Sequence, residues 1–323
     1  MSRTIARRSD IAPLQSKLPT PLRFPLLVVL SLSLSSFLYS LAAPVIEGDL
    51  ASVSRRLEGW GEVLGLAGWK AGELGLGWWG GFDGYDLAAL SLLGKGPSLY
   101  LLGTFYNIRA ATVVTSLLID ALATYIPFRL LRPLSRAHAA STAPDSTIVP
   151  NKDIVTDSSI QILTTLLASS IYSLTLFSAY ATYLPVYFVT YFNKIYSIEA
   201  AHSATLVSLF PITLLLGVAA KSFIFTPAAA AAPSLLEARD TVFNPATATL
   251  TETFWYNVWS FSPRTRTVIQ RTATLALVSG VNTFVQTYVT IEGVEAVGAL
   301  AYAGVWAVAA VVTGASLGAV GAV

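Results

Sequence analysis

A carboxyl group stands near the centre of a stretch long enough to cross a membrane. Asp120 lies between Arg109 and Arg129, and the intervening residues are otherwise uncharged. A charged aspartate at the middle of a membrane helix costs about 2.5–3.5 kcal/mol on insertion scales. Such a residue normally faces a bundle interior or a wet cavity, where it pairs with a cation or exchanges a proton. Asp120 is therefore the first candidate for chemistry.

Polar side chains share the helical face of Asp120. Ser116 and Thr124 lie four residues to either side of it, so the three follow one ridge of a helix. Two cationic residues on later apolar segments can form an ion pair with the carboxylate, namely Lys221 and Arg271. The inward lean expected for the lysine stem favours Lys221. A structural ion pair is the main expectation, and a proton- or ion-handling site is the alternative.

The segment 268–290 carries a second polar edge. Arg271, Ser279, Asn282 and Gln286 fall within one face of a regular helix. Amides on such a face either line an aqueous path or hydrogen-bond neighbouring helices. We favour hydrogen bonding between helices.

Catalytic motifs are scarce in this sequence. The residues GASLG at 314–318 match G-x-S-x-G, but that motif needs a strand–turn–helix elbow. Within an apolar helix, Gly314 and Gly318 indicate close helix packing instead. The two histidines, His138 and His202, are expected on opposite sides of the membrane, and the chain has no cysteine. We therefore expect no catalytic residue, metal site or cofactor.

Aromatic and basic side chains gather in the segment 227–267. Leu250, Phe254, Val258 and Phe261 follow a 4,4,3 spacing, which predicts one face of an amphipathic helix. Such a helix lies in the membrane interface with arginines at lipid headgroups; the alternative is that its aromatics pack beneath the bundle. The candidate headgroup contacts are Arg129, Arg132, Arg264, Arg266, Trp255 and Trp259.

The elements that position these residues are membrane helices. Hydrophobic residues make up 54% of the chain and charged residues only 12%, about half the share of charged residues in soluble domains. We predict an all-α polytopic membrane protein of about six transmembrane helices with aromatic-rich interfacial segments. The predicted spans are 25–43, 105–128, 160–184, 203–225, 268–290 and 296–319.

Lysine and arginine counts predict the orientation of these spans. The basic segments place both termini in the cytosol or the mitochondrial matrix. The expected units are a basic head (1–24), the first two spans (25–128), a basic cytosolic loop (129–157), the third and fourth spans (158–226), a cytosolic linker (227–267) and the last two spans (268–323). One alternative is that 87–106 hides a further broken span, which would reverse all later segments.

The segment 44–97 is expected as a lumenal loop rich in glycine and tryptophan. Trp60, Trp69 and Trp78 recur every nine residues. Dense glycine disfavours a rigid helix, and tryptophan prefers the headgroup layer. We favour a flexible flap anchored on the outer leaflet over a lid or a partner-binding element.

No single activity follows from these patterns. The net charge of +2 gives no basic excess for nucleic acid. The leading hypothesis is a non-enzymatic scaffold, assembly factor or lipid-interacting component of an internal membrane. An endoplasmic-reticulum-like membrane is favoured over the mitochondrial inner membrane. The expected partners are the lipid bilayer and other membrane proteins, through Gly314 and Gly318. A transporter or channel using Asp120 is the second hypothesis, and a lipid-modifying enzyme the third.

Overall fold

The computed structural model describes residues 19–57, 59–135, 137–139, 151–231, 249–251, 253 and 261–320. This part of the chain is all-helical and contains no strand. The long helices are α1 (Thr20–Val53), α2 (Trp60–Trp79), α3 (Gly84–Phe105), α4 (Ala110–Leu131), α6 (Ser158–Thr182), α9 (Leu206–Ala220), α13 (Pro263–Val285) and α14 (Ala296–Val320). The shorter elements are α5 (Lys152–Thr156), α7 (Leu184–Tyr191), α8 (Glu199–His202), α10 (Thr226–Ala229) and the π-helical turns η2 (Lys221–Phe225) and η3 (Gln286–Thr290).

Five helical stretches in the described part are long and apolar enough to cross a membrane. They are Pro21–Val53, Ala110–Leu131, Ser158–Thr182, Leu206–Ala229 and Ala296–Val320. They coincide with five of the six predicted spans. The predicted span 268–290 is also helical, as α13 and η3. Its arginines and its polar edge make it less apolar than the other five.

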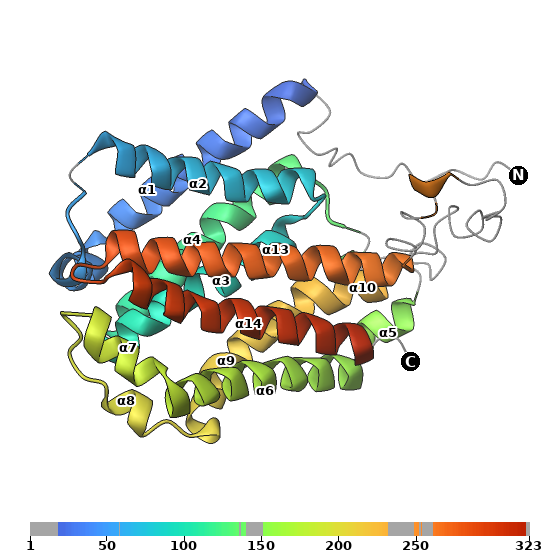
Figure 1. Ribbon diagram of the computed structural model, residues 1–323. Helices are drawn as coiled ribbons and strands as arrows, with labels where there is room; N and C mark the ends of the chain where they lie inside the picture. The colour runs from blue at the N-terminus through green and yellow to red at the C-terminus, as the bar shows by residue number, and fades with distance from the viewer. Residues whose placement is uncertain are drawn as a thin grey trace, which may run out of the picture.

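The helices lie side by side in an elongated bundle (Figure 1). Helix α3 occupies the centre and packs against α4, α9 and α13, while α14 packs against α13 and α6. Helix α1 covers α4. Helix α1 begins and α14 ends at the same end of the bundle, which we call the His138 end; the opposite end is the Glu292 end (Figure 1).

The segment 44–97 is helical, so the prediction of a flexible loop there is wrong. Helix α1 continues to Val53, and α2 and α3 then form a helical hairpin. An added Cβ at Gly77 would lie 2.9 Å from the side chain of Leu87, so this glycine allows α2 to approach α3 closely. The turn between them contains Gly81 at a φ of 75°, a conformation that glycine adopts without strain. Tertiary packing therefore overrides the weak helix propensity of glycine.

The further helix considered for 87–106 exists as α3. Most of its leucines and Phe105 are almost fully buried, including Leu90 and Leu101 at 0% exposure. Because α2 and α3 run in opposite directions, together they leave the directions of the later helices unchanged (Figure 1). The reversal of the later segments, which that alternative would have caused, therefore does not follow.

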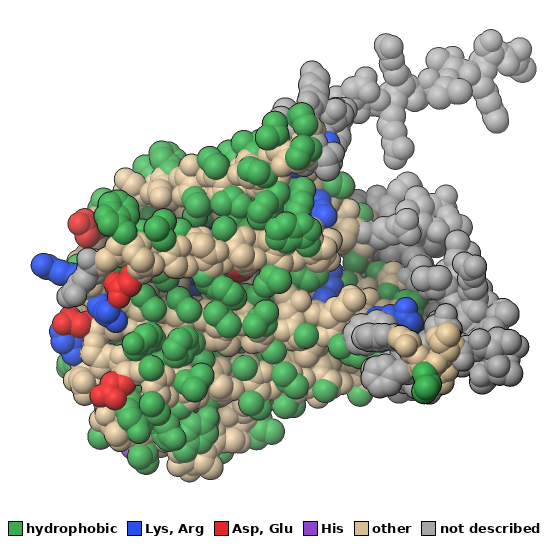
Figure 2. Space-filling model, turned by 45° about the horizontal axis from the view of Figure 1, so that its top comes forward, with side chains coloured by type: hydrophobic (Ala, Val, Ile, Leu, Met, Phe, Trp, Pro, Cys, Tyr) green, Lys and Arg blue, Asp and Glu red, His purple; other side chains and the backbone are tan. Residues whose placement is uncertain are grey.

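Between the two ends, the face seen in Figure 2 carries many hydrophobic side chains and almost no charged ones. Large aliphatic side chains such as Leu163 and Leu300, each 65% exposed, point outward. Charged side chains gather at the Glu292 end (Figure 2). The ion pairs there are Arg55–Glu62, Arg109–Asp49 and Lys194–Glu292. An apolar belt beside a charged end is compatible with membrane association.

Candidate functional site

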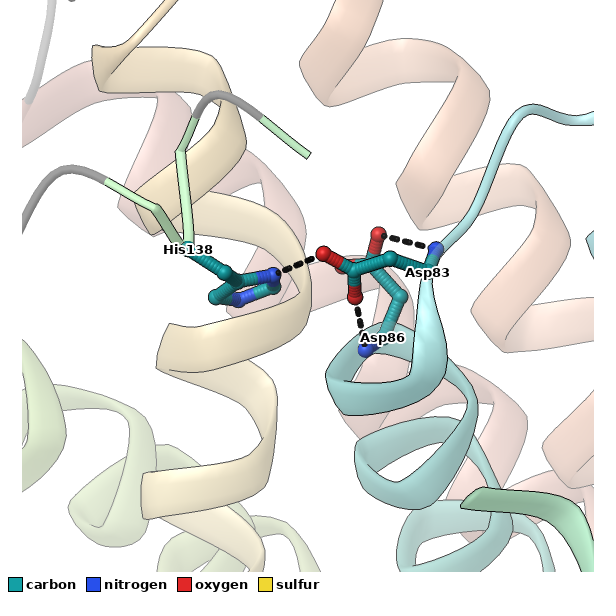
Figure 3. Close-up of side chains that lie close together, drawn as sticks. All are labelled: Asp83, Asp86 and His138. Carbon is teal, nitrogen blue, oxygen red and sulfur yellow. Dashed lines mark hydrogen bonds and ion pairs between the residues drawn. The ribbon is translucent and has the colours of Figure 1, made fainter. Parts of the chain in front are cut away.

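Two aspartates begin helix α3 at the His138 end. Asp83 is the N-cap, and its Oδ1 accepts a hydrogen bond from the backbone N–H of Asp86 at 2.9 Å. Asp86 Oδ2 accepts in return from the N–H of Asp83 at 3.2 Å (Figure 3). This reciprocal capping box satisfies two amides that the first turn of a helix leaves free. Both carboxyl groups are buried, with exposures of 1% and 0%.

A guanidinium group from α13 neutralises the deeper aspartate. Arg271 Nη1 and Nη2 donate to the two carboxylate oxygens of Asp86 at 2.5 and 3.0 Å. Arg271 also donates to the carbonyl of Phe223 at 2.7 Å. Its charge lies 4.8 Å from the ring centre of Phe82 and 5.1 Å from that of Phe223. The paired geometry and the aromatic rings compensate the loss of water around a buried charge.

The second aspartate binds an imidazole. His138 Nδ1 lies 2.8 Å from Asp83 Oδ2, which also accepts from the N–H of Ser135 at 2.8 Å (Figure 3). Burial alone would lower the pKa of His138, but the hydrogen bond to Asp83 and the charges of Asp86 and Asp83 raise it overall. Burial opposes ionisation of Asp83, yet its hydrogen bonds to His138 and the backbone hold its pKa well below the usual range. Both groups therefore favour their charged forms.

This cluster has the elements of two kinds of chemistry but completes neither. Ligand atoms of Asp83, Asp86 and His138 lie within 4.8 Å of one another, as in a metal site. However, the carboxylate oxygens are already engaged by Arg271, His138 and backbone amides, so the arrangement does not fit a cation. His138 Nε2 lies 3.3 Å from the hydroxyl of Ser222, so an acid, an imidazole and a hydroxyl stand in a row.

The hydroxyl of that row stands apart from the cavity beside the cluster. A cavity of about 290 Å³ adjoins the cluster, with Phe82, Ser135 and Arg271 in its wall. Ser222 is not among its lining residues. The cluster instead joins the start of α3, the segment after α4, η2 and α13. We interpret the cluster as a structural contact that holds these four elements together.

One of the arginines expected at lipid headgroups is bound within the protein. Arg132 Nη1 donates to the carbonyls of Gly77, Trp78 and Phe82 at 3.3, 2.9 and 3.1 Å. It therefore caps the end of α2, and the prediction that it contacts lipid gains no support from this geometry. Arg129 is exposed. The other candidates are Arg264 and Arg266, in the first turn of α13, and Trp255 and Trp259, which lie outside the described residues.

Asp120 borders a cavity with polar and apolar walls between α1, α3, α4 and η3. The cavity volume is about 250 Å³. Of the predicted site residues, it brings together Asp120, Ser116 and Gln286. Two unpredicted residues, Tyr39 of α1 and Lys95 of α3, also face it. The other lining residues are Leu50, Val53, Ser54, Ser98, Leu99, Leu102, Thr290 and Ile291.

The predicted pairing of Asp120 with Lys221 is wrong. Lys221 Nζ donates to Gln161 Oε1 at 3.4 Å, and Arg271 binds Asp86. The reason is that α3 lies between α4 and the helices that carry these cations. Thr124, also expected on the polar ridge, hydrogen-bonds to the backbone carbonyl of Asp120 at 3.0 Å.

The predicted helix-packing interpretation of Asn282 agrees with the structure. Its Oδ1 accepts from Trp69 Nε1 at 2.7 Å, and its Nδ2 donates to Glu73 Oε1 at 3.3 Å. Glu73 is 1% exposed and also pairs with Lys70 at 3.1 Å. These bonds fasten α2 to α13. Asn282 is not one of the residues that line the cavity beside Gln286.

Sequence reasoning missed most of the acids in these clusters. Asp83, Asp86 and Glu73 lie in the segment that was interpreted as a loop. They could therefore not be assigned to the face of a helix. One signal for the start of α3 was available. Asp83 and Asp86 stand three residues apart directly before an apolar run, which is the spacing of a capping box.

Comparison with known proteins identifies the family of this chain. A family model described as the bouquet formation protein 3 C-terminal domain matches residues 157–320, just over half of the chain. The chain belongs to this family. No curated protein and no solved structure matches it. The family is linked to the nuclear envelope and the endoplasmic reticulum, in agreement with the expected endomembrane location.

The family domain begins at the N-cap of α6, Asp157, and ends with α14. It binds the preceding helices through polar contacts as well as apolar packing. Arg271 and Asn282 reach Asp86 and Glu73, as described above. In addition, Ser279 donates to the carbonyl of Leu93 at 3.1 Å, and Tyr302 donates to that of Pro97 at 2.7 Å. Helices α2 and α3 are therefore integral to the packing of this domain.

Proposed function

We propose that the chain is a non-enzymatic, multi-pass scaffold of the nuclear envelope and the connected endoplasmic reticulum, which holds a membrane helix of a partner protein during bouquet formation. The family match and the five span-length apolar helices support this proposal. The buried ionic groups at the His138 end are satisfied by one another, which also favours a structural role. Transport and lipid modification gain no support from the family match.

One observation carries the proposal of a partner helix. Gly61, Gly65, Gly68 and Gly72 lie within about a 60° arc of α2 at 100° per residue. An added Cβ at any of them would meet no atom within 4 Å. A helix of 20 residues is about 30 Å long, which matches the thickness of the hydrocarbon layer, although α2 with its three charged residues is not one of the five span-length apolar stretches. The stripe is therefore an open face along which another backbone can approach.

Small-residue faces are how membrane helices associate closely. Between helices in a bilayer the hydrophobic effect gives no attraction, because the lipid tails are equally apolar. Glycines let two backbones approach closely, so that van der Waals contacts can hold the helices together. The face expected to bind partners, on α14, is used within the chain instead. Gly314 contacts Thr272 of α13, and an added Cβ at Gly318 would lie 3.0 Å from Val268. We therefore place partner binding on α2.

Photo-crosslinking in native membranes tests this proposal. A photoreactive residue replaces Leu64, which lies next to the glycine stripe and is 66% exposed. We expect crosslinks to peptides from a membrane-spanning segment of another protein. The double substitution Gly65→Leu/Gly68→Leu should abolish them. The matched control Gly304→Leu, on an equally open glycine of α14, should not.

The other outcomes discriminate clearly. Crosslinks to α2 of a second copy would show that the chain binds itself. Crosslinks to lipid alone, unchanged by the double substitution, would overturn the proposal. The proposed orientation, with both termini in the cytosol, is checked separately with terminal tags probed by protease before and after membrane permeabilisation.

A further inference from the structure

The cavity beside Asp120 contains two opposite charges that do not touch. Asp120 of α4 and Lys95 of α3 both line it. No ion pair joins them, and the ammonium group of Lys95 makes no hydrogen bond within the described part of the chain. Both residues lie about 15 Å along their helices from the Glu292 end, at 1.5 Å per residue. The charge of Lys95 is attracted by the buried carboxylate of Glu73, but the ammonium group keeps its hydrogen-bond donors free. At that depth, such donors require water or a ligand.

Further polar groups face the same space. The hydroxyl of Ser116 is 1% exposed and has no hydrogen-bond partner in the described structure. The hydroxyl of Tyr39 lies next to the carboxyl group of Asp120. Gln286 and Thr290 face the cavity from η3, a π-helical turn of the kind that often occurs at functional sites. A buried donor without a partner is costly unless something occupies the site.

The rim of the cavity lies at the Glu292 end. Ser54 and Ile291 form an isolated antiparallel bridge there, and both line the cavity. The backbone N–H of Arg55 donates to the carbonyl of Thr290 at 2.8 Å, which holds the rim together. The volume of about 250 Å³ equals the share of about eight waters in the liquid. That space admits a small polar molecule or a lipid headgroup.

We propose that this cavity binds a small zwitterion, in which a primary ammonium group is linked to a phosphate or carboxylate. The ammonium group binds Asp120 and the hydroxyl of Tyr39, and the anionic group binds Lys95. Ser116 and Gln286 supply further hydrogen bonds. One zwitterion gives hydrogen bonds to both charged groups of the cavity at once, whereas a lone cation or anion leaves one of them without a hydrogen-bond partner. The same chemistry occurs in free phosphoethanolamine and in the headgroup of phosphatidylethanolamine.

This site is independent of the proposed scaffold function. The glycine stripe and the cavity share no residue, and the test below measures ligand binding instead of partner crosslinking. Either proposal can therefore fail while the other stands.

The first arm of the test uses the full chain in nanodiscs of phosphatidylcholine, whose quaternary ammonium cannot donate hydrogen bonds. Isothermal titration calorimetry with phosphoethanolamine should show saturable binding. Lys95→Gln and Asp120→Asn should each weaken it by about tenfold or more, since each removes a charge-assisted hydrogen bond. The control Lys194→Gln removes a lysine from the exposed pair with Glu292 and should leave the affinity unchanged.

The second arm separates a soluble ligand from a lipid. Nanodiscs that contain phosphatidylethanolamine are analysed by native mass spectrometry. Retention of this lipid by the wild type, and its loss in Lys95→Gln and Asp120→Asn, would identify the headgroup as the source. Binding in the first arm alone would identify a free zwitterion.

Two smaller ligands, each with only one of the two charged groups, test the proposal on the wild-type chain even if both variants fail to fold. Ethanolamine and inorganic phosphate are titrated into the wild-type chain, and each should bind at least about tenfold more weakly than phosphoethanolamine. Equal binding of ethanolamine would make the cavity a cation site, and equal binding of phosphate an anion site; both results overturn the proposal. Absence of binding in both arms overturns it as well.

Discussion

Removal of the guanidinium group of Arg271 should destabilise the bundle strongly. The side chain of Asp86 is fully buried and that of Arg271 is 9% exposed, so neither group can regain water when its partner is lost. Breaking a buried pair in this way typically costs about 3–5 kcal/mol. Arg271→Met keeps the length of the side chain and leaves the Asp86 carboxylate with only the capping amide of Asp83. We expect a loss in the free energy of unfolding within this range.

Two further variants separate the ion pair from general effects of substitution. Asp86→Asn/Arg271→Met removes both charges and keeps an acceptor for the capping box. It should be more stable than Arg271→Met alone, by about 1–3 kcal/mol of coupling. The control Arg109→Met breaks an exposed pair, in which the arginine side chain is 63% exposed. It should cost less than about 1 kcal/mol.

Unfolding by sodium dodecyl sulfate in mixed micelles, followed by tryptophan fluorescence, measures these differences. The reasoning is refuted if Arg271→Met is no more destabilising than Arg109→Met. It is also refuted if the double variant is less stable than the single one, because the two charges would then not be coupled.

Three other outcomes follow from the structure. Gly65→Ala and Gly68→Ala should each raise stability by about 0.8–1 kcal/mol, because their Cβ atoms enter open space and alanine favours the helix; thermal unfolding in detergent checks this. The His138–Asp83 pair should stabilise the fold most between about pH 4 and pH 6.5. Its contribution falls as pH rises through the raised pKa of His138, and as pH drops through the lowered pKa of Asp83. His138→Gln should therefore flatten the decline above about pH 6.5 in a pH series of unfolding midpoints. Gly217→Ala would place a Cβ 2.7 Å from a backbone oxygen of α6 and should cost about 1–3 kcal/mol, read from the unfolding temperature.

Hydrophobic runs predicted most of the bundle. Span-length apolar segments need no tertiary information, because length and composition alone separate them from soluble helices. The prediction for the segment 44–97 was wrong because the structure there depends on tertiary packing. The glycines of this segment lower intrinsic helix propensity, and their use becomes visible only when Gly77 is seen against Leu87. Propensity is a weak guide where close packing decides.

The candidate sites depended on that same segment. Asp120, Ser116 and Gln286 could be singled out because each stands on a recognisable helical face. The sequence did not predict that Lys95 lines the same cavity. Lys95 belongs to α3, and the packing of α3 against α4 is a tertiary contact that the pattern of either helix does not reveal. The partner of Arg271 was missed for the same reason. Spacing along a helix predicts its own face but not which helix comes to lie opposite.

The buried pair between α3 and α13 has a consequence for biosynthesis. Asp86 and Arg271 are separated by 185 positions in the chain. At a synthesis rate of about 5–20 residues per second, Arg271 is made about 10–40 s after Asp86. During that interval the acid has no guanidinium to neutralise it. Helix α3, the centre of the finished bundle, is therefore expected to take its final place late, after the C-terminal helices have left the ribosome.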